Sequence, residues 1–294
     1  MRFRSKSDIM LEVISYVFMG LFSIFCLIPF ILVIINSIVP EADLAANGFT
    51  LIPKRISFDA YKIVFKGNVV LNAYKVTIFV TVVGTVLSMI VTSLMAYPLS
   101  VKNLKYRNYI AMYVYITMLF SGGLVPSYIL ITRYLHLDNT IWVYIIPSLI
   151  NPWNLFVLRN FFGTIPDSLA ESARIDGASE VYILWKIILP LSKPAIATLS
   201  LFYALGYWNE WFKCVLYITD QKLYTLQYLI MAIMRDIQML TQYAQEMNMP
   251  VNYILPQQTV RMATTVVTIG PIIFLYPFLQ KYFIKGLVIG AVKG

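Results

Sequence analysis

Five long stretches of this chain contain no charged residue, and they restrict its fold more than any other feature. They hold 28, 26, 25, 20 and 19 residues, at positions 13–40, 76–101, 108–132, 139–158 and 262–280. A helix needs about 20 apolar residues to cross the hydrocarbon layer of a membrane. Lipid offers no water to unpaired backbone groups, so an isolated spanning segment has to be a helix. The stretches therefore predict five transmembrane helices.

A sixth span is expected after Lys193, ending near Ile218, although Glu210 and Lys213 interrupt it. Only 13% of the 294 residues are charged, against about 25% in soluble domains. We therefore expect one all-α integral membrane domain over residues 1–294. The first apolar stretch is too long for a cleavable signal peptide and is expected to stay as a span. The predicted spans are 13–39, 76–100, 108–131, 139–158, 194–218 and 262–280.

Basic residues flanking the spans predict their orientation. With the N-terminus in the cytoplasm, the inner segments hold 13 Lys and Arg residues and the outer segments hold 10. The bias is modest, but the inner segments are mostly short and close to the spans. The positive-inside rule, by which Lys and Arg favour the cytoplasmic side, applies most strongly there. An even number of spans places both termini in the cytoplasm. The net charge of +9 is then mainly a topology signal, and no nucleic-acid partner is expected.

Residues 163–190, which we call the hook, lie on the cytoplasmic side in this topology. Their sequence predicts two short helices separated by a sharp bend. Thr164 and Asp167 fit a capping box at the first helix, Gly177 fits its end, and Ser179 fits the cap of the second. Pro190 is expected to stop the second helix. Apolar faces are expected at Ile165, Leu169, Ser172 and Ala173, and at Val181, Leu184, Trp185 and Ile188. From spacing alone, an ordinary pair of amphipathic interfacial helices remains an alternative.

The second part of the hook reads ESARIDGASEVYILWKIILP, residues 171–190. It resembles the coupling loop of ATP-binding-cassette (ABC) importer permeases, with Ser172 departing from the usual Ala. Asp176 before Gly177 is typical of the sugar branch of that family. The resemblance implies that the hook docks on a cytoplasmic ATPase, with Glu171 anchored to a basic residue there. The coupling residues implied are Glu171, Ser172, Ala173, Asp176, Gly177, Leu189 and Pro190.

The resemblance covers nearly the whole chain. Residues 158–162, 165–166 and 175–178 look like carbohydrate permeases of the maltose type. Residues 120–126 and the end of the chain from Tyr276 look like a sub-branch for oligosaccharides and polysaccharide fragments, including alginate-type importers. A type I ABC importer permease fold is implied, together with import of oligosaccharides; polysaccharide-derived and uronate-containing ones are among the candidates. The Ala-Val-Lys-Gly ending resembles the shorter, second subunit of a heterodimeric permease pair.

The family implies several partners in the cytoplasmic membrane of a prokaryote. They are a second permease subunit, two copies of a cytoplasmic ATPase and an extracytoplasmic solute-binding protein. The chain has no Gly-x-x-x-x-Gly-Lys-Ser/Thr phosphate loop, so ATP and Mg are expected on the ATPases. No catalytic site, bound cofactor, metal site or disulfide framework is expected. The tail 286–294 resembles a family tail that reaches the ATPase pair.

The sugar path is less clear from the sequence. Polar residues at membrane depth are costly and often functional. Those in the fourth and fifth spans make the candidate path: Asn151, Asn154, Trp208, Asn209 and Glu210. The alternative is structural anchoring near the outer interface, with Glu210 paired to Lys213. His136 is expected to be a solvated loop or interface residue, and the outer stretch 220–260 to touch the binding protein or cover the spans.

Two other functions stay open. An ion-coupled secondary transporter would need ionisable residues near the middle of the membrane, and the first four predicted spans contain none. A membrane scaffold without transport activity is the second alternative. The sequence does not identify the sugar or its length.

Overall fold

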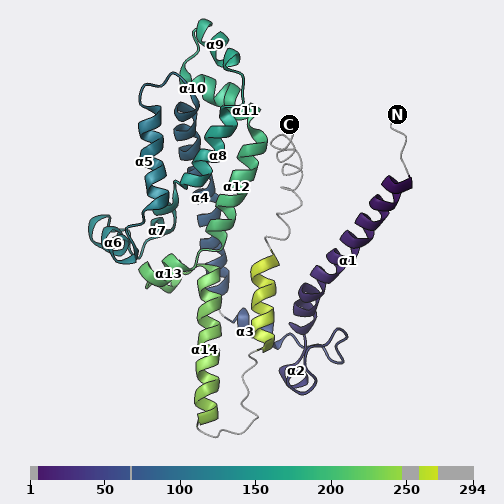
Figure 1. Cartoon of the computed structure of the whole chain (residues 1–294). Helices are drawn as coiled ribbons and strands as arrows, with labels where there is room; N and C mark the ends of the chain where they lie inside the picture. Colours follow the sequence, from purple (N-terminus) through teal and green to yellow (C-terminus); the bar gives the residue numbers. More distant parts are fainter. Residues whose placement is uncertain (1–5, 67, 247–257, 271–294) are drawn as a thin grey trace. The chain divides into compact units, whose positions relative to one another are not determined.

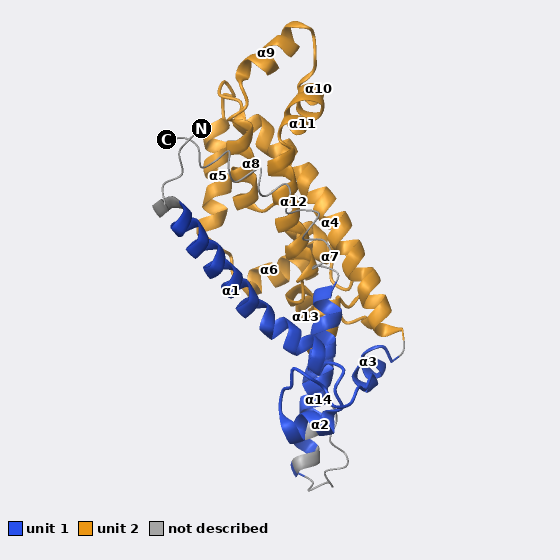
Figure 2. Cartoon of the chain, turned by 90° about the vertical axis from the view of Figure 1, so that its right-hand side faces the viewer, with its two compact units in different colours: residues 1–67, 232–271 blue, residues 68–231, 272–294 orange. Residues whose placement is uncertain are grey.

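The computed structural model describes residues 6–66, 68–246 and 258–270, and every regular element in these ranges is helical. The chain divides into two compact units (Figure 2), which are described separately. Unit 1 consists of residues 1–67 and 232–271, and unit 2 of residues 68–231 and 272–294.

Unit 2 is organised around one long helix, α4 (Val69–Ser100). The helices α8 (Pro152–Phe162) and α12 (Lys193–Trp208) pack against it (Figure 1). The buried side of α4 is rich in small and hydroxyl residues, which let neighbouring helices approach closely. Those buried on α4 are Ala73, Thr77, Thr81, Gly84, Ser88, Thr92, Ser93 and Ala96.

The predicted third span, 108–131, is not one straight helix in the structure. It contains α5 (Arg107–Leu119) and α6 (Leu124–Ile129), and α6 continues into the π-helix η1 (Leu130–Tyr134). The two parts meet at an angle of 113°. The break falls at Ser121-Gly122-Gly123, where Gly123 has a φ of 85°. Glycine adopts this left-handed conformation readily, which explains why the helix stops here.

The predicted fourth span, 139–158, is also divided. It contains α7 (Trp142–Ile145), the 3₁₀ turn η2 (Ile146–Ser148) and the first part of α8. Pro152 occupies the first position of α8, where its missing N–H costs nothing. The Asn151 side chain caps the helix by accepting a hydrogen bond of 3.1 Å from the backbone N–H of Asn154.

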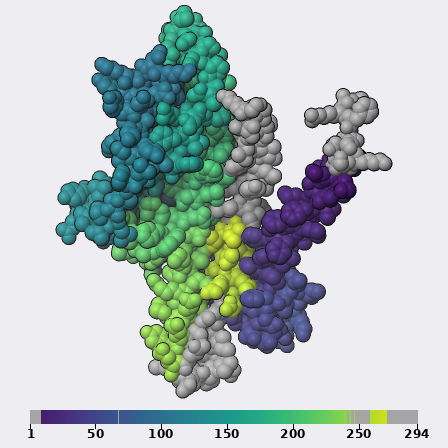
Figure 3. Space-filling model, in the orientation of Figure 1, coloured from purple at the N-terminus to yellow at the C-terminus, as the bar shows by residue number. Residues whose placement is uncertain are grey.

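The hook lies at one end of unit 2 and projects from it (Figures 1 and 3). Its helices are α9 (Asp167–Ile175), α10 (Glu180–Ile183), the π-helix η3 (Leu184–Ile188) and α11 (Leu189–Leu191). The helix α12 then leaves at 87° to the stretch Glu180–Leu191. The predicted fifth span, 194–218, holds most of α12, a break, and α13 (Phe212–Tyr217). A short turn, η4 (Gln221–Leu223), leads to α14 (Leu226–Glu246).

Unit 1 contains α1 (Lys6–Asn36), α2 (Glu41–Asn47), α3 (Asp59–Val64), the second part of α14 and a helix over 258–270. Its last helix is capped by the Glu41 carboxylate, which accepts hydrogen bonds from the backbone N–H groups of Gln258 and Thr259 at 3.0 and 2.9 Å. A carboxylate at a helix N-terminus is favoured by the helix dipole. The rest of the predicted sixth span, 271–280, and the tail 286–294 lie outside the described residues.

Two described helices are long and apolar enough to cross a membrane, over Ile9–Asn36 and Val69–Ser100. The number rises to four if each of two bent helix pairs forms one span. These two helices match the first two predicted spans. A total of six spans stays a prediction.

Candidate functional site

Gly177 forms the bend of the hook. Its φ is 81°, a left-handed backbone angle, and α9 ends just before it, so the predicted end of the first helix at Gly177 is confirmed. The Gly177 N–H donates to the Arg174 carbonyl at 3.0 Å, and the Ala178 N–H donates to the Ala173 carbonyl at 2.9 Å. These two bonds are the Schellman pattern that ends a helix on a left-handed residue. The direction of the chain after α9 is therefore set by this glycine.

The two predicted caps of the hook have different outcomes. Ser179 is confirmed, since its Oγ accepts a hydrogen bond from the backbone N–H of Tyr182 at 3.3 Å. The capping box at Thr164 is wrong: its hydroxyl donates to the Phe161 carbonyl instead. Pro166 holds the N-cap position in an extended conformation, with a ψ of 128°, so α9 starts too late for Thr164 to cap it.

Pro190 does not stop the second helix, contrary to the sequence prediction. It lies inside α11, and the helical stretch ends at Leu191. The π-helix η3 precedes it, and proline is tolerated here because it sits in the first turn of α11, where its missing N–H is not needed. The buried residues of this stretch are Ile183, Leu184 and Ile188, whereas the predicted face residues Val181 and Trp185 are exposed.

The first helix of the hook, α9, has one side against a small cavity and another in the open. Asp167, Ala170, Glu171 and Arg174 share one side at helical spacing and line a cavity of about 120 Å³. On the expected apolar face, Ile165 and Ala173 are half-buried, but Leu169 and Ser172 are exposed. Ile175, at the end of the helix, is 86% exposed.

Two side chains donate hydrogen bonds to the carboxylate of Glu180. Arg174 Nε donates to Oε1 at 2.6 Å and its Nη2 donates to Oε2 at 3.2 Å. The Tyr97 hydroxyl donates to Oε2 at 2.5 Å. The hydrogen bond from Arg174, followed by that from Tyr97, holds the pKa of the Glu180 carboxyl below its ordinary value. The group is therefore a carboxylate at neutral pH.

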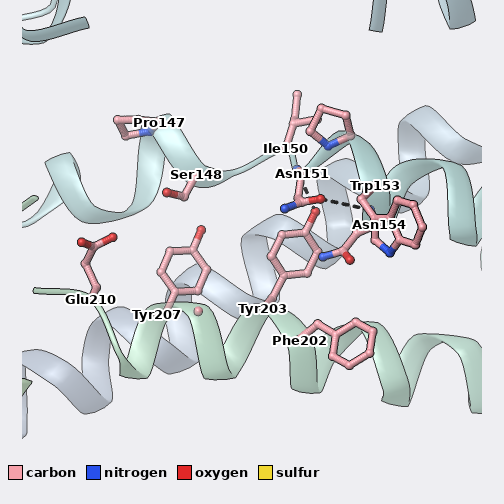
Figure 4. A pocket seen from close by; sticks show the side chains of 12 residues that line it. Pro147, Ser148, Ile150, Asn151, Trp153, Asn154, Phe202, Tyr203, Tyr207 and Glu210 are labelled. Atoms are coloured by element: carbon pink, nitrogen blue, oxygen red, sulfur yellow. Dashed lines mark hydrogen bonds between the residues drawn. The ribbon is translucent and has the colours of Figure 1, made fainter. Parts of the chain in front are cut away.

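A larger cavity of about 550 Å³ lies between the α7–α8 segment and α12, and we call it the α8–α12 cavity (Figure 4). It brings together three of the five candidate path residues, Asn151, Asn154 and Glu210. Trp208 and Asn209 do not line it. Trp208 is buried, and the amide of Asn209 donates to the Leu205 carbonyl at 2.8 Å. Successive helical residues point about 100° apart, so a run of neighbours cannot share one face.

Two tyrosines of α12 form the floor of this cavity, and the sequence analysis did not single them out. The Tyr203 hydroxyl shares a hydrogen bond of 2.8 Å with Thr92 and accepts one of 3.1 Å from the Asn151 backbone N–H. The Tyr207 hydroxyl shares a hydrogen bond of 2.8 Å with Ser88. Tyrosines four residues apart on an apolar helix are the signal that could have found them. The other lining residues are Pro147, Ser148, Ile150, Pro152, Trp153, Phe202 and Gly206.

Glu210 is the one charged residue among those that line the α8–α12 cavity. Its carboxylate forms an ion pair with the Lys213 ammonium group and accepts a hydrogen bond of 2.9 Å from the Lys213 backbone N–H. The pairing of Glu210 with Lys213, which belonged to the alternative of structural anchoring, is thus present, and it balances the negative charge at the cavity. Amides, hydroxyls and the aromatic faces of Trp153 and Phe202 then make a surface that suits a polyhydroxylated ligand.

Comparisons with known proteins also indicate a membrane transport protein. Residues 1–289 match the family model described as binding-protein-dependent transport system inner membrane component. Two proteins of Bacillus subtilis (strain 168) are each 42% identical to the chain. The polygalacturonan/rhamnogalacturonan transport system permease protein YtcP matches over 96% of this chain and 98% of its own. Protein LplC matches over 99% of this chain and 97% of its own.

A solved structure is similar over nearly the whole chain as well. It is the crystal structure of a bacterial ABC transporter involved in the import of the acidic polysaccharide alginate. The TM-score is 0.81 and the sequence identity is 31%, over 96% of this chain and 100% of the matched chain. The helical arrangement described above is therefore that of a known membrane permease.

Proposed function

This chain belongs to the family of binding-protein-dependent transport system inner membrane components, and from that membership we propose the details of its function. It is a permease of an ABC importer for oligosaccharides, located in the inner membrane. As a permease subunit it is not itself catalytic and binds no cofactor, because ATP is bound by the partner ATPases. The observation that carries the assignment is the match over 96% of the chain both to a polygalacturonan/rhamnogalacturonan transport system permease protein and to the structure of a bacterial ABC transporter involved in the import of alginate.

The chain works as part of an ABC transporter complex. Our proposal for the composition is a heterodimer with a second permease subunit, two copies of an ATPase and an extracytoplasmic solute-binding protein. The hook docks in a cleft of one ATPase through its exposed tip, with Ile175 in contact and Glu171 anchored to a basic residue. When ATP closes the ATPase pair, the hook moves and the spans pass from an outward to an inward opening. The exposed bend and tip of the hook support this docking.

The α8–α12 cavity is the proposed substrate path on this subunit. Asn151, Asn154 and Glu210 contact sugar hydroxyls there, together with Tyr203 and Tyr207. The amide and hydroxyl groups offer both donors and acceptors. Because Lys213 balances the charge of Glu210, the cavity does not strongly repel an acidic sugar. Oligosaccharides rich in uronate are therefore the proposed substrates.

Uptake by cells tests the proposed function and its alternatives together. We expect deletion of the gene for this chain to abolish uptake of labelled oligogalacturonates. A copy of the gene on a plasmid should restore it. Loss of the partner ATPase should have the same effect. Uptake that survives ATPase loss but stops when an ionophore removes the ion gradients would identify a secondary transporter. Unchanged uptake after deletion would identify a scaffold.

The orientation is tested by cysteine labelling, in a background lacking Cys26 and Cys214. We propose that both termini and the hook face the cytoplasm and that the end of α14 faces outward. A single cysteine at Glu246 should then react with an impermeant maleimide on intact cells, and one at Ser168 should react only after permeabilisation. The reverse pattern would contradict the orientation.

A further inference from the structure

The carboxylate of Glu180 joins three elements of unit 2. Tyr97 reaches it from the end of α4, Arg174 from the last turn of α9, and Glu180 itself begins α10. Both carboxylate oxygens are engaged, one by Arg174 alone and the other by Arg174 and Tyr97. Bonds to a charged group are roughly twice as strong as neutral ones. One side chain thus ties the two arms of the hook to each other and to α4.

One other described polar contact joins the hook to the end of α4 or to the segment 101–106 that follows it. Lys102 donates to Asp167 at 2.8 Å, but these side chains are 71% and 61% exposed, so solvent screens the pair. Arg174 and Glu180 are themselves 37% and 55% exposed, whereas Tyr97 is only 7% exposed and is the buried member of the three. Its ring belongs to the same buried cluster as Ile183 and Leu184 of the hook. Apolar packing alone does not fix the orientation of the hook on α4, so we assign that role to the hydrogen bond from the Tyr97 hydroxyl to Glu180.

The same helix supports the α8–α12 cavity further along its length. Thr92 and Ser88 of α4 hold the hydroxyls of Tyr203 and Tyr207 by hydrogen bonds of 2.8 Å. The helix α4 is a single helical element from Val69 to Ser100, with Pro98 inside its last turn. Because Tyr97, Thr92 and Ser88 all lie on this helix, a displacement of Tyr97 would be carried along α4 to the two tyrosines that line the cavity.

We propose that Tyr97, with Glu180 and Arg174, is a positioning residue that couples the hook to α4. When an ATPase displaces the hook, the attachment transmits the movement to α4 and to the cavity. Without the attachment, the hook moves relative to α4 and the cavity does not follow. The proposal rests on the proposed function, because it needs an ATPase that acts on the hook. We call the three residues the Glu180 clamp.

The direct test is Tyr97→Phe, which removes one hydroxyl and keeps the buried ring. The matched control is Tyr109→Phe on α5, where the tyrosine is 77% exposed. The assembled complex is reconstituted in vesicles, and oligogalacturonate uptake is divided by ATP hydrolysed. Tyr97→Phe should recover the ATPases normally yet lower uptake per ATP by roughly threefold to tenfold, the range expected for loss of one ordinary hydrogen bond, because the Glu180 side chain is 55% exposed and solvent weakens the effect of its charge. Tyr109→Phe should match wild type.

Backbone hydrogen exchange over residues 178–183 gives a readout that needs no substrate. Tyr97→Phe should speed exchange there, because the hook opens more often. The effect should shrink in a Glu180→Gln background, where the bidentate Arg174 contact is already lost. If Tyr97→Phe changed neither the hydrogen exchange nor the uptake per ATP hydrolysed, the proposed role of the Glu180 clamp would be wrong. A loss of uptake that only follows lost ATPase recovery would contradict it as well.

The clamp and the proposed function fail in different ways. A wild-type complex without ATP-dependent uptake counts against the proposed function, and hydrogen exchange still decides whether the clamp holds the hook. A wild-type complex that imports the sugar, with a Tyr97→Phe variant of equal transport ratio, counts against the clamp alone.

Discussion

Replacing Gly177 with valine is expected to abolish most recovery of the partner ATPases while leaving the chain inserted in the membrane. Gly177 holds a φ of 81°, and nothing lies within 4 Å of a Cβ atom added there. The penalty is therefore backbone strain and not a clash, about 1–2 kcal/mol for an ordinary residue and more for a β-branched one. Relief of the strain turns the hook away from its docking direction. Since 1.4 kcal/mol is tenfold in affinity, docking should weaken at least about tenfold.

Two companion variants separate the backbone angle from the loss of glycine itself. Gly177→Asn should keep most ATPase binding, because asparagine tolerates the left-handed region better than other residues. Gly163→Ala is the control within the hook, since the φ of Gly163 is −67° and suits any residue. Pull-down of the ATPases with the purified permease pair measures all three. Normal recovery with Gly177→Val would mean that the hook does not carry the docking.

The second large effect is expected from Gly84→Ala on α4. A methyl group there would lie 2.8 Å from ring carbons of Tyr207, so the ring has to move. The ring is not free to do so, because its hydroxyl is bonded to Ser88 and lies 3.4 Å from the Ile145 carbonyl. Overpacking of this kind typically costs 1–3 kcal/mol, so we expect a loss of about 2 kcal/mol or more. The melting temperature of the purified complex should fall, and uptake with it.

Gly206→Ala is the matched control for stability. Gly206 lies on α12 one residue before Tyr207, but an added methyl group meets nothing within 4 Å. Its melting temperature should stay near that of the wild type. Equal melting temperatures for Gly84→Ala and Gly206→Ala would show that α4 and α12 do not pack as described.

Local chemistry predicted those parts of the hook that depend on a few neighbouring residues. The bend at Gly177 and the cap at Ser179 each rest on contacts within five residues. The cap at Thr164 failed because the extended Pro166 takes the N-cap position, and the stop at Pro190 failed because a π-helix shifts the bonding pattern before it. In each case two local signals compete, Thr164 with Pro166 and Pro190 with the π-helix, and the sequence alone does not show which of the two prevails.

The cavity depends on contacts between residues far apart in the chain. Tyr203 and Thr92 are separated by 111 positions, and Tyr207 and Ser88 by 119. Each tyrosine alone looks like an ordinary residue of an apolar helix. The lengths of the uncharged stretches likewise predicted where the spans lie but not the break at Gly123. The length of a stretch does not show that a glycine within it adopts a positive φ. Pairing of α4 with α12 had to be seen in the structure.

Reconstitution of the complete transporter tests the central claim most directly. The chain is placed in vesicles with the second permease subunit and the ATPases, and labelled oligogalacturonate is supplied with the solute-binding protein. We predict accumulation that requires ATP on the ATPase side, requires the binding protein and disappears in the Gly177→Val variant. Accumulation that proceeds without ATP and follows an imposed ion gradient would contradict the account, as would no accumulation by the complete and assembled system.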